Sequence, residues 1–274
     1  MTVRDALTSV TDELATAGVP SPRVDAEHLL VAATTLTRTE LYLDHRELSE
    51  AEARRLRALV ARRRAREPLA YVLGEWGFRR LTLTLDRRVL IPRPETEIVV
   101  ERCLALLAGL EHPTVLDVGT GSGAIALSLA DEHPGARVTA IDASADALAV
   151  AGENVRRTGL RVELDRHDFT TGLPGGPYDL VVSNPPYVPE TELEGLAPEV
   201  RDWEPRSAIA DRGGAAAVIR HARAVLRTGG WLVLETHWLG ARDVARAVEE
   251  NGYGPPRISQ DLAGRERVVE ARWR

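Results

Sequence analysis

A short polar segment with two adjacent prolines follows an apolar run in the second half of the chain. Residues 178–182 read Tyr-Asp-Leu-Val-Val, a pattern typical of a buried parallel strand, and they are followed by Ser183-Asn184-Pro185-Pro186-Tyr187. Neither proline can donate a hydrogen bond to a neighbouring strand. We therefore expect the strand to end here in a stiff loop with free carbonyl groups.

The side chains of this loop suit the recognition of a planar NH2 group. The amide oxygen of Asn184 and the carbonyl of Pro185 can accept its two hydrogens, and the Tyr187 ring offers a flat face for stacking. A strand followed by a proline-rich turn is the simpler interpretation, and it would suffice for a lone Pro-Pro pair. The full string favours a site for a primary amide or an exocyclic amine, with Asn184 and Pro185 as catalytic residues and Pro186 and Tyr187 lining the slot.

A glycine-rich segment, Asp117-Val118-Gly119-Thr120-Gly121-Ser122-Gly123, lies where an earlier apolar strand meets a helix. Open α/β sheets bind ligands in the crevice at this position, and the glycines permit a tight turn and a close approach of the backbone to a ligand. The spacing differs from the Gly-x-Gly-x-x-Gly fingerprint of dinucleotide-binding proteins, which argues against NAD. By itself the segment would also fit a simple tight turn.

Acidic residues end the next two strands. Asp142 lies nineteen residues after Gly123, where a carboxylate can accept from both hydroxyls of a ribose, although it could also only cap the strand end. Asp168-Phe169 pairs a carboxylate for an exocyclic amine with a ring for stacking, as an adenine site requires. Because no phosphate-binding lysine accompanies these residues, the set indicates S-adenosylmethionine, with its amino-acid end over the glycine-rich segment.

The surrounding pattern predicts an α/β protein with a helical N-terminal part. Residues 2–66 have helical periodicity, with Thr2 as one cap and Ser49 and Glu52 as a capping box. Segments 81–85 and 89–91 alternate in the manner of a β-hairpin, and a helix is expected from Pro94 to about residue 110. From Thr114 onward strands and helices alternate, which predicts a parallel sheet covered on both faces. The expected domains are residues 1–80, a hairpin linker at 81–93, and residues 94–274.

Composition narrows the class of protein. The chain has 274 residues, of which 44% are hydrophobic and 28% charged, values typical of globular proteins. No apolar run approaches the ~18 residues of a membrane span and no signal peptide is evident, so we expect a cytoplasmic protein. The single cysteine, Cys103, cannot form an internal disulfide, and the seven histidines show no metal-ligand spacing. We therefore expect no metal, and we expect a monomer.

Charge is distributed unevenly. Residues 1–82 contain 13 arginines and 12 acids, whereas residues 83–274 contain 22 arginines and 29 acids. The acidic larger part disfavours tight contact with a nucleic-acid backbone, so no direct nucleic-acid binding is expected. Seven arginines gather within residues 54–66. They form either a solvated helix face or a docking surface for an acidic or RNA-bound partner.

Taken together, these motifs give the chain a resemblance to the class I S-adenosylmethionine-dependent methyltransferases that modify planar nitrogens. It looks most like the bacterial release-factor glutamine N5-methyltransferases, the PrmC/HemK family. The likeness covers almost the whole chain. The segments that carry it are Ser21 to Glu27, Glu67 to Gly74, Leu90-Ile91-Pro92-Arg93-Pro94-Glu95-Thr96-Glu97, Asp117 to Gly123, Asn184 to Tyr187, and Trp203-Glu204-Pro205.

The resemblance implies a Rossmann-like, mostly parallel seven-stranded sheet and a five-helix-type N-terminal domain that helps to hold a protein substrate. It also implies methylation of the glutamine in the Gly-Gly-Gln loop of class I peptide release factors, which would be the partners. By position, Asn184 and the Pro185 carbonyl would bind the glutamine amide. The cofactor S-adenosylmethionine would contact Asp117, Gly119, Thr120, Gly121, Ser122, Gly123, Asp142, Asp168, Phe169 and Asn184.

Three segments depart from the family pattern. Phe78-Arg79-Arg80-Leu81 has arginines where an aromatic residue and glycine are usual, Gly214-Ala215-Ala216 replaces an acidic-Gly-Leu run, and His237 to Leu239 replaces residues that include Gly and Gln. All three lie off the expected cofactor site, so they bear on which amide is methylated. An N-methyltransferase acting on a small-molecule amide, or on an exocyclic amine of a nucleic-acid base, is the alternative.

Overall fold

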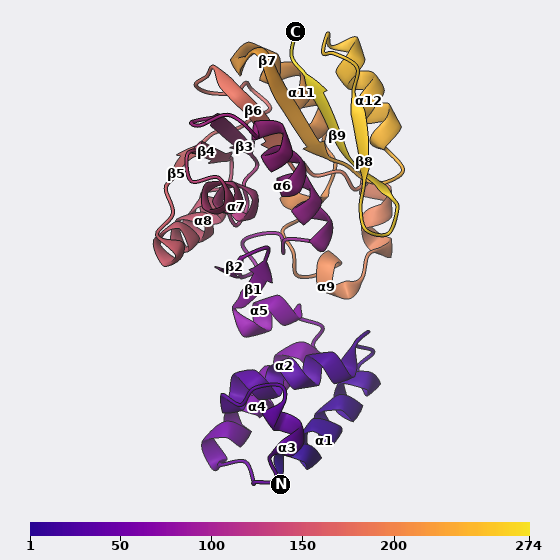
Figure 1. Ribbon diagram of the computed structural model, residues 1–274. Helices are drawn as coiled ribbons and strands as arrows, with labels where there is room; N and C mark the ends of the chain where they lie inside the picture. Colours follow the sequence, from indigo (N-terminus) through magenta and orange to yellow (C-terminus); the bar gives the residue numbers. More distant parts are fainter. The chain divides into compact units, whose positions relative to one another are not determined.

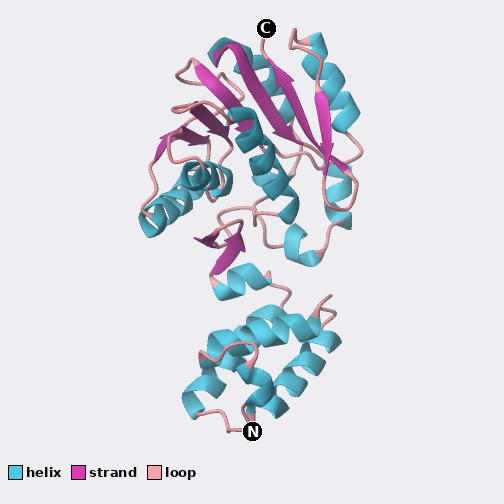
Figure 2. Cartoon of the chain, in the orientation of Figure 1, coloured by secondary structure: helices cyan, strands magenta, loops and turns pink.

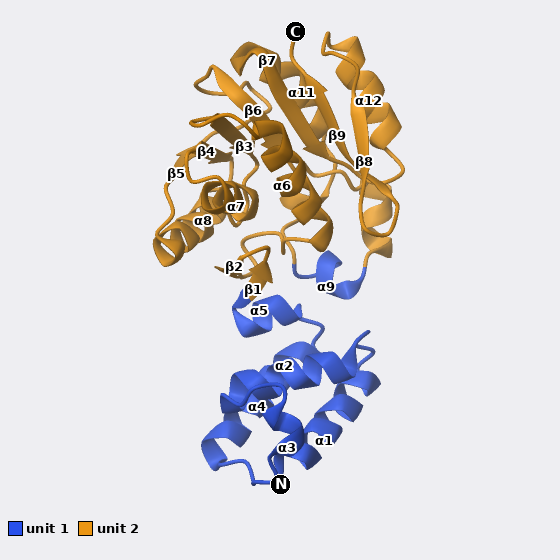
Figure 3. Cartoon of the chain, in the orientation of Figure 1, with its two compact units in different colours: residues 1–75, 197–203 blue, residues 76–196, 204–274 orange.

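The computed structural model describes all residues from 1 to 274, and they form two compact units. Unit 1 comprises residues 1–75 and 197–203, and unit 2 comprises residues 76–196 and 204–274 (Figure 3). Unit 1 is helical, whereas unit 2 contains the large sheet (Figure 2). The division into domains at residues 80 and 93 remains a prediction. Sequence patterns did not indicate that residues 197–203 belong with the N-terminal unit.

Unit 1 is built from short and medium helices around one apolar core. Thr2 and Ser49 begin α1 and α4 through capping boxes with Asp5 and Glu52, which confirms both predicted caps. The short helices α3, α5 and α9 were not predicted, because four or five residues are too few to show helical periodicity. The helices of this unit are α1 (Val3–Thr16), α2 (Pro22–Thr34), α3 (Glu40–Leu43), α4 (Glu50–Arg64), α5 (Leu69–Leu73) and α9 (Pro198–Arg201).

The seven arginines of residues 54–66 do not share one environment. Arg63 is only 4% exposed, and its guanidinium donates to Asp25 of α2 at 2.7 Å and to Glu199 of α9 at 2.9 Å. Arg66 binds the same Glu199 carboxylate, and Arg62 pairs with Glu67. The interpretation as a solvated face is therefore wrong for the buried Arg63, whereas Arg54, Arg55, Arg57, Arg62 and Arg64 are exposed. The docking surface remains a prediction. Arg63 and Arg66 hold α9 to the end of α4, and Arg63 also holds α2, whereas Arg62 donates to the Tyr71 and Val72 carbonyls of α5.

The hairpin of the structure lies earlier in the chain than predicted. Strands β1 (Glu75–Phe78) and β2 (Leu81–Thr84) pair as a two-stranded sheet, and residues 89–91 form no strand. Arg79 adopts a left-handed φ of 49°, which reverses the chain between the two strands. Beyond β2, Arg88 folds back onto Asp86 in an ion pair, so the chain turns away before a second ladder can form. The predicted hairpin of 81–85 with 89–91 is wrong.

The seven-stranded sheet of unit 2 has the order β5-β4-β3-β6-β7-β9-β8, and every neighbouring pair is parallel except those that include β9. This agrees with the predicted mostly parallel sheet. The strands are β3 (Thr114–Val118), β4 (Arg137–Asp142), β5 (Val162–Arg166), β6 (Tyr178–Ser183), β7 (Leu226–Glu235), β8 (Arg257–Gln260) and β9 (Glu266–Arg272). Strand β6 is buried along its whole length, as its apolar run predicts.

Helices cover both faces of this sheet (Figure 1). On one face lie α6 (Pro94–Leu107), α7 (Ala124–Glu132) and α8 (Ala145–Thr158), and on the other lie α11 (Gly214–Val225) and α12 (Ala241–Glu250). Cys103 is a fully buried residue of α6. Two further short elements, the 3-10 helix η1 (Glu190–Gly195) and α10 (Arg206–Ile209), lie between β6 and α11. No helix in the chain has both the length and the apolar character needed to cross a membrane.

Candidate active site

Four parallel strands end together at one edge of the sheet. Val118 of β3 lies opposite Ile141 of β4 and Ser183 of β6, and Ser183 lies opposite Leu234 of β7. The Ser183 hydroxyl also donates to the Val118 carbonyl at 2.7 Å. The residues that follow these positions therefore lie side by side at this edge. In this way the glycine-rich segment, Asp142, Asn184 and Glu235 come together, although they are far apart in the sequence.

The glycine-rich segment forms a loop whose backbone only glycine adopts easily. Gly119, Gly121 and Gly123 all have positive φ, with values of 73°, 56° and 84°. The amides of Gly119 and Thr120 donate to the Ile141 carbonyl at 2.9 and 3.0 Å, which holds the loop against β4. A Cβ atom on Gly123 would lie 3.2 Å from the Leu127 side chain. The tight turn expected from the sequence is thus present at the start of α7.

Asp117 is the next-to-last residue of β3, just before this loop, and is almost fully buried. Its Oδ2 accepts from the Thr120 hydroxyl at 2.6 Å and from the Ala126 amide at 3.2 Å, whereas its Oδ1 has no partner. Burial raises the pKa of this carboxyl to about 7, against the effect of the two hydrogen bonds. A buried oxygen without a partner is costly, so it suits a ligand that brings its own N–H donor.

Asp142 has the strand-end role that was one of its two interpretations. Its two oxygens accept from the Gly121 amide at 3.0 Å and from the Ser144 amide at 2.9 Å. Burial nevertheless raises the pKa of the carboxyl, because it outweighs the hydrogen bonds from the backbone. Each carboxylate oxygen has a second lone pair, so both can still accept from the hydroxyls of a ribose.

Asp168 and Phe169 follow β5 and differ in their surroundings. Phe169 lies next to the glycine loop, with its ring 3.9 Å from the position that a Cβ on Gly119 would take. Asp168 is exposed, and its Oδ1 accepts from the hydroxyl and the amide of Thr170 at 2.7 and 2.9 Å. These two bonds, that from the hydroxyl first, lower the pKa of the carboxyl. The Phe169 ring therefore lies beside the glycine loop, whereas the Asp168 carboxylate bonds within its own segment.

The segment after β6 is held from several sides. The Asn184 amide nitrogen donates to the Thr96 hydroxyl of α6 at 3.4 Å, and the Tyr187 hydroxyl lies 3.4 Å from Oε1 of Glu235. Gly214, the first residue of α11, packs so closely that a Cβ there would lie 3.2 Å from the Pro185 ring. The second departure from the family pattern thus places a residue without a side chain against the first proline.

The other two departures also have structural roles. Arg79 donates from its backbone to Glu97 of α6 at 2.9 Å and through its guanidinium to Glu132 of α7 at 2.8 Å, so it anchors the hairpin turn. The His237 ring lies 6.1 Å from the Tyr187 ring and 5.9 Å from that of Trp238. His237 therefore borders the Asn-Pro-Pro-Tyr segment.

Several residues around the site were not predicted from the sequence. Thr96 lies in a segment that is noticeable only through the family resemblance. Glu235 lies in a strand, and nothing in the sequence distinguishes it as a site residue. Asn154 of α8 is fully buried and donates to the carbonyls of Ser122 and Thr84 at 2.9 and 3.1 Å, which joins the glycine loop to β2. No sequence signal distinguishes it from other helical asparagines. Arg93 binds the buried Glu204 carboxylate at 2.6 Å, which joins two family segments.

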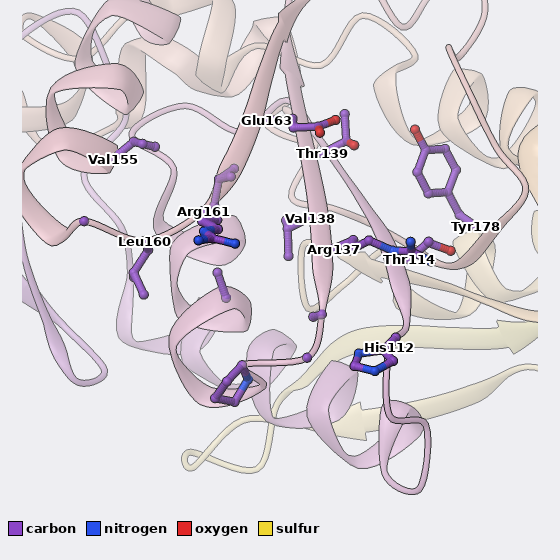
Figure 4. Close-up of a pocket in the computed structure, with 16 residues that line it drawn as sticks. His112, Thr114, Arg137, Val138, Thr139, Val155, Leu160, Arg161, Glu163 and Tyr178 are labelled. Atoms are coloured by element: carbon purple, nitrogen blue, oxygen red, sulfur yellow. The ribbon is translucent and has the colours of Figure 1, made fainter.

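A pocket of about 900 Å³ lies at the opposite end of the sheet. Figure 4 shows residues that line it at the beginnings of strands, among them Thr114, Arg137 and Tyr178. None of the predicted site residues lines this pocket. Ligands of open α/β sheets bind outside the carboxyl ends of the strands, which favours the loops described above as the site.

The fold and these loops define a class I methyltransferase. The mostly parallel seven-stranded sheet carries a glycine loop after β3, and residues 98–197 match the family model described as the methyltransferase small domain. Residues 5–74 match the model of the PrmC N-terminal domain. A crystal structure of the 16S rRNA N2 G1207 methyltransferase RsmC of Thermus thermophilus, in complex with AdoMet and guanosine, has the same fold. Its TM-score is 0.52 at 19% identity, over 73% of this chain and 50% of that one.

Curated relatives narrow the class further. The release factor glutamine methyltransferase of Caulobacter vibrioides is 39% identical over 98% of this chain and 96% of its own length. That of Moorella thermoacetica is 44% identical over 99% and 98%. The chain belongs to the family of release factor glutamine methyltransferases.

Proposed function

We propose that this chain transfers a methyl group from S-adenosylmethionine to the side-chain amide nitrogen of the glutamine in the Gly-Gly-Gln loop of class I peptide release factors. The observation that carries the proposal is the position of Asn184. Asn184 directly follows β6 and lies beside the glycine loop, at the edge where β3 and β6 end together. Full-length similarity to release factor glutamine methyltransferases supports this choice of acceptor.

The residues of the glycine loop fit the cofactor on two grounds. The backbone at Gly119 and Gly121 has no Cβ to keep a ligand away, and the Asp117 Oδ1 is buried without a partner. Asp117 would then face the amino-acid end of S-adenosylmethionine, Asp142 its ribose and Phe169 its adenine. The bound cofactor supplies a methyl group on a sulfonium centre that is already activated for transfer.

The protein's own part in the reaction is to hold and orient the amide. An amide nitrogen is a poor nucleophile because its lone pair is delocalised into the carbonyl. Asn184 Oδ1 and the Pro185 carbonyl would accept both N–H hydrogens, which directs the nitrogen and stabilises the positive charge that develops on it. Positioning supplies much of the rate in such a transfer, so no strong general base is required at the nitrogen.

The proposal is tested by supplying labelled S-adenosylmethionine together with separate acceptors: a class I release factor, the same factor with its Gly-Gly-Gln glutamine changed to alanine, tRNA and DNA. We expect label on the unmodified factor only, at the glutamine nitrogen, as read by mass spectrometry of the Gly-Gly-Gln peptide. Label on tRNA or DNA instead would favour the base-modifying alternative. Equal label on both forms of the factor would place the acceptor elsewhere.

A further inference from the structure

A buried carboxyl group that the proposed mechanism does not use lies directly behind the Asn-Pro-Pro-Tyr segment. Glu235, the last residue of β7, is 1% exposed. Its Oε1 lies 3.4 Å from the Tyr187 hydroxyl, and its Oε2 has no partner. Because Ser183 and Leu234 are opposite each other in neighbouring strands, Asn184 and Glu235 lie next to each other where β6 and β7 end.

The groups around this carboxyl come from three elements. Helix α6 contributes the Thr96 hydroxyl and the Glu95 carboxylate, β9 contributes Arg267, and the loop after β6 contributes Tyr187. The pKa of Glu235 is raised to about 7, chiefly by burial; Glu95 acts in the same direction, whereas the Thr96 and Tyr187 hydroxyls and Arg267 oppose the rise. The carboxyl therefore changes its protonation state near neutral pH.

Thr96 lies between this carboxyl and the residue that would bind the substrate. Its oxygen accepts from the Asn184 amide nitrogen at 3.4 Å, and the nearby Thr96 hydroxyl lowers the pKa of Glu235 as a hydrogen-bond donor would. An asparagine side chain can present either its oxygen or its NH2 group after a half turn, and the hydrogen-bond network decides which. An ionised carboxylate can only accept hydrogen bonds. The Thr96 hydroxyl would then donate to Glu235, and the Thr96 oxygen would accept from the Asn184 NH2 group.

We propose that Glu235 and Thr96 are positioning residues that turn the oxygen of the Asn184 amide toward the substrate. With Glu235 ionised, the order of donors runs from Asn184 to Thr96 to Glu235, and Asn184 Oδ1 is free to accept from the substrate amide. With Glu235 protonated, its O–H donates to Thr96, Thr96 donates to Asn184, and the NH2 group of Asn184 faces the substrate. Two NH2 groups cannot bond to each other, so the second arrangement is inactive.

This inference rests on the proposed function for its consequence in catalysis, but the orientation itself does not depend on the acceptor. Side-chain amide resonances of ¹⁵N-labelled protein, with Asn184 assigned through Asn184→Asp, report the orientation directly. We expect the Asn184 resonances of the wild type to titrate with a midpoint near pH 7, and to be independent of pH in Glu235→Gln and in Thr96→Val. Glu249→Gln, an exposed change on α12, is the matched control and should titrate as the wild type does.

Methyl transfer is the second readout. The kcat of the wild type should rise with pH through the same midpoint, whereas Glu235→Gln should lose about tenfold or more at pH 8 and show no acid limb. The KM for S-adenosylmethionine should change less than about twofold. Thr96→Ser keeps the hydroxyl and should restore both the rate and the pH profile that Thr96→Val loses.

The outcomes separate this inference from the proposed function. Asn184 resonances that titrate identically in the wild type, Glu235→Gln and Thr96→Val would overturn the inference, whatever the acceptor is. The inference also fails if Glu235→Gln keeps the wild-type rate and pH profile. A wild-type protein that methylates no release factor but shows the Asn184 titration would overturn the proposed function and support the orientation by Glu235.

Discussion

At the scale of single residues, the candidate site depends on polar side chains that emerge where strands end. Each of them also serves the fold: Asp142 accepts from two backbone amides, and Asp117 bonds to Thr120 and Ala126. Asn184 differs, because only one half of its amide has a partner in the protein. That contrast separates a residue expected to act on the substrate from those expected to hold the cofactor.

Replacing Asn184 by alanine should therefore affect the transfer step. We expect methyl transfer to fall by ~10²-fold or more while S-adenosylmethionine still binds, as for the loss of one hydrogen-bond partner of a transition state. Steady-state rates with both substrates saturating, together with calorimetry of the cofactor, measure the two effects. Asn251→Ala, at the end of α12, is the control. Near-normal turnover in Asn184→Ala would contradict the mechanism.

Asp142→Ala should act on the cofactor instead. If the carboxylate accepts from the ribose hydroxyls, its removal should weaken S-adenosylmethionine binding by ~1.5–3 kcal/mol, the range for hydrogen bonds to a charged group. Calorimetry measures this affinity, and a melting curve shows whether the loop still folds without the bonds to Gly121 and Ser144. Asp165→Ala, an exposed change in β5, should leave the affinity unchanged. An unchanged affinity in Asp142→Ala would assign that residue to the strand end alone.

At the scale of elements, arginines determine how several short segments pack. Arg63 joins α4 to α2 and α9, and Arg79 joins the hairpin to α6 and α7. Buried ion pairs of this kind are strongly destabilised when one partner is removed, because the remaining charge stays buried without compensation. Exposed pairs contribute little, because water screens them.

Two neighbouring arginines of α4 allow a matched test of this difference. Arg63→Ala leaves the Asp25 carboxylate in a buried position and should cost about 3–5 kcal/mol in the free energy of unfolding. Arg64→Ala removes a largely exposed partner of Glu13 and should cost less than about 1 kcal/mol. Urea unfolding followed by circular dichroism compares the two variants. Equal losses would mean that the Arg63 pairs are as well solvated as the Arg64 pair.

At the scale of the whole molecule, the chain combines a helical unit with a methyltransferase unit. We propose that the helical unit binds parts of the protein substrate outside the Gly-Gly-Gln loop. Such remote contacts help by positioning the glutamine, and their contribution disappears when the substrate is shortened.

A full-length release factor should accordingly be methylated much faster than a short Gly-Gly-Gln peptide, with a difference in kcat/KM that falls as salt is added. Because Arg62, Arg63 and Arg66 are engaged within unit 1, the exposed Arg57 of α4 is the better probe of a docking surface. Arg57→Glu should slow methylation of the factor and leave the peptide rate unchanged. Equal rates for factor and peptide in the wild type would remove the remote contact from the proposal.

Several elements of the fold could be predicted from residues that are neighbours in the sequence. The apolar run of β6 and its two prolines, the glycine loop after β3, and the caps at Thr2 and Ser49 each depend on residues next to one another, so their patterns predict the elements. The alternation of strands and helices from Thr114 onward predicts the parallel sheet. The carboxyl ends of parallel strands lie at a common edge of the sheet. The sequence alone therefore indicates both the fold class and the residues that gather at that edge.

Contacts between segments that are distant in the sequence determine the features that could not be predicted. Thr96 and Glu235 meet Asn184 and Tyr187 only because α6 packs beside the ends of β6 and β7, and Arg63 is buried only because residues 197–203 return to the N-terminal unit. The hairpin shifted because Arg79 could take a left-handed conformation that its ion pairs hold in place. Burial and pairing are properties of the packed chain, and no local pattern of residue types encodes which charges will share one enclosed space.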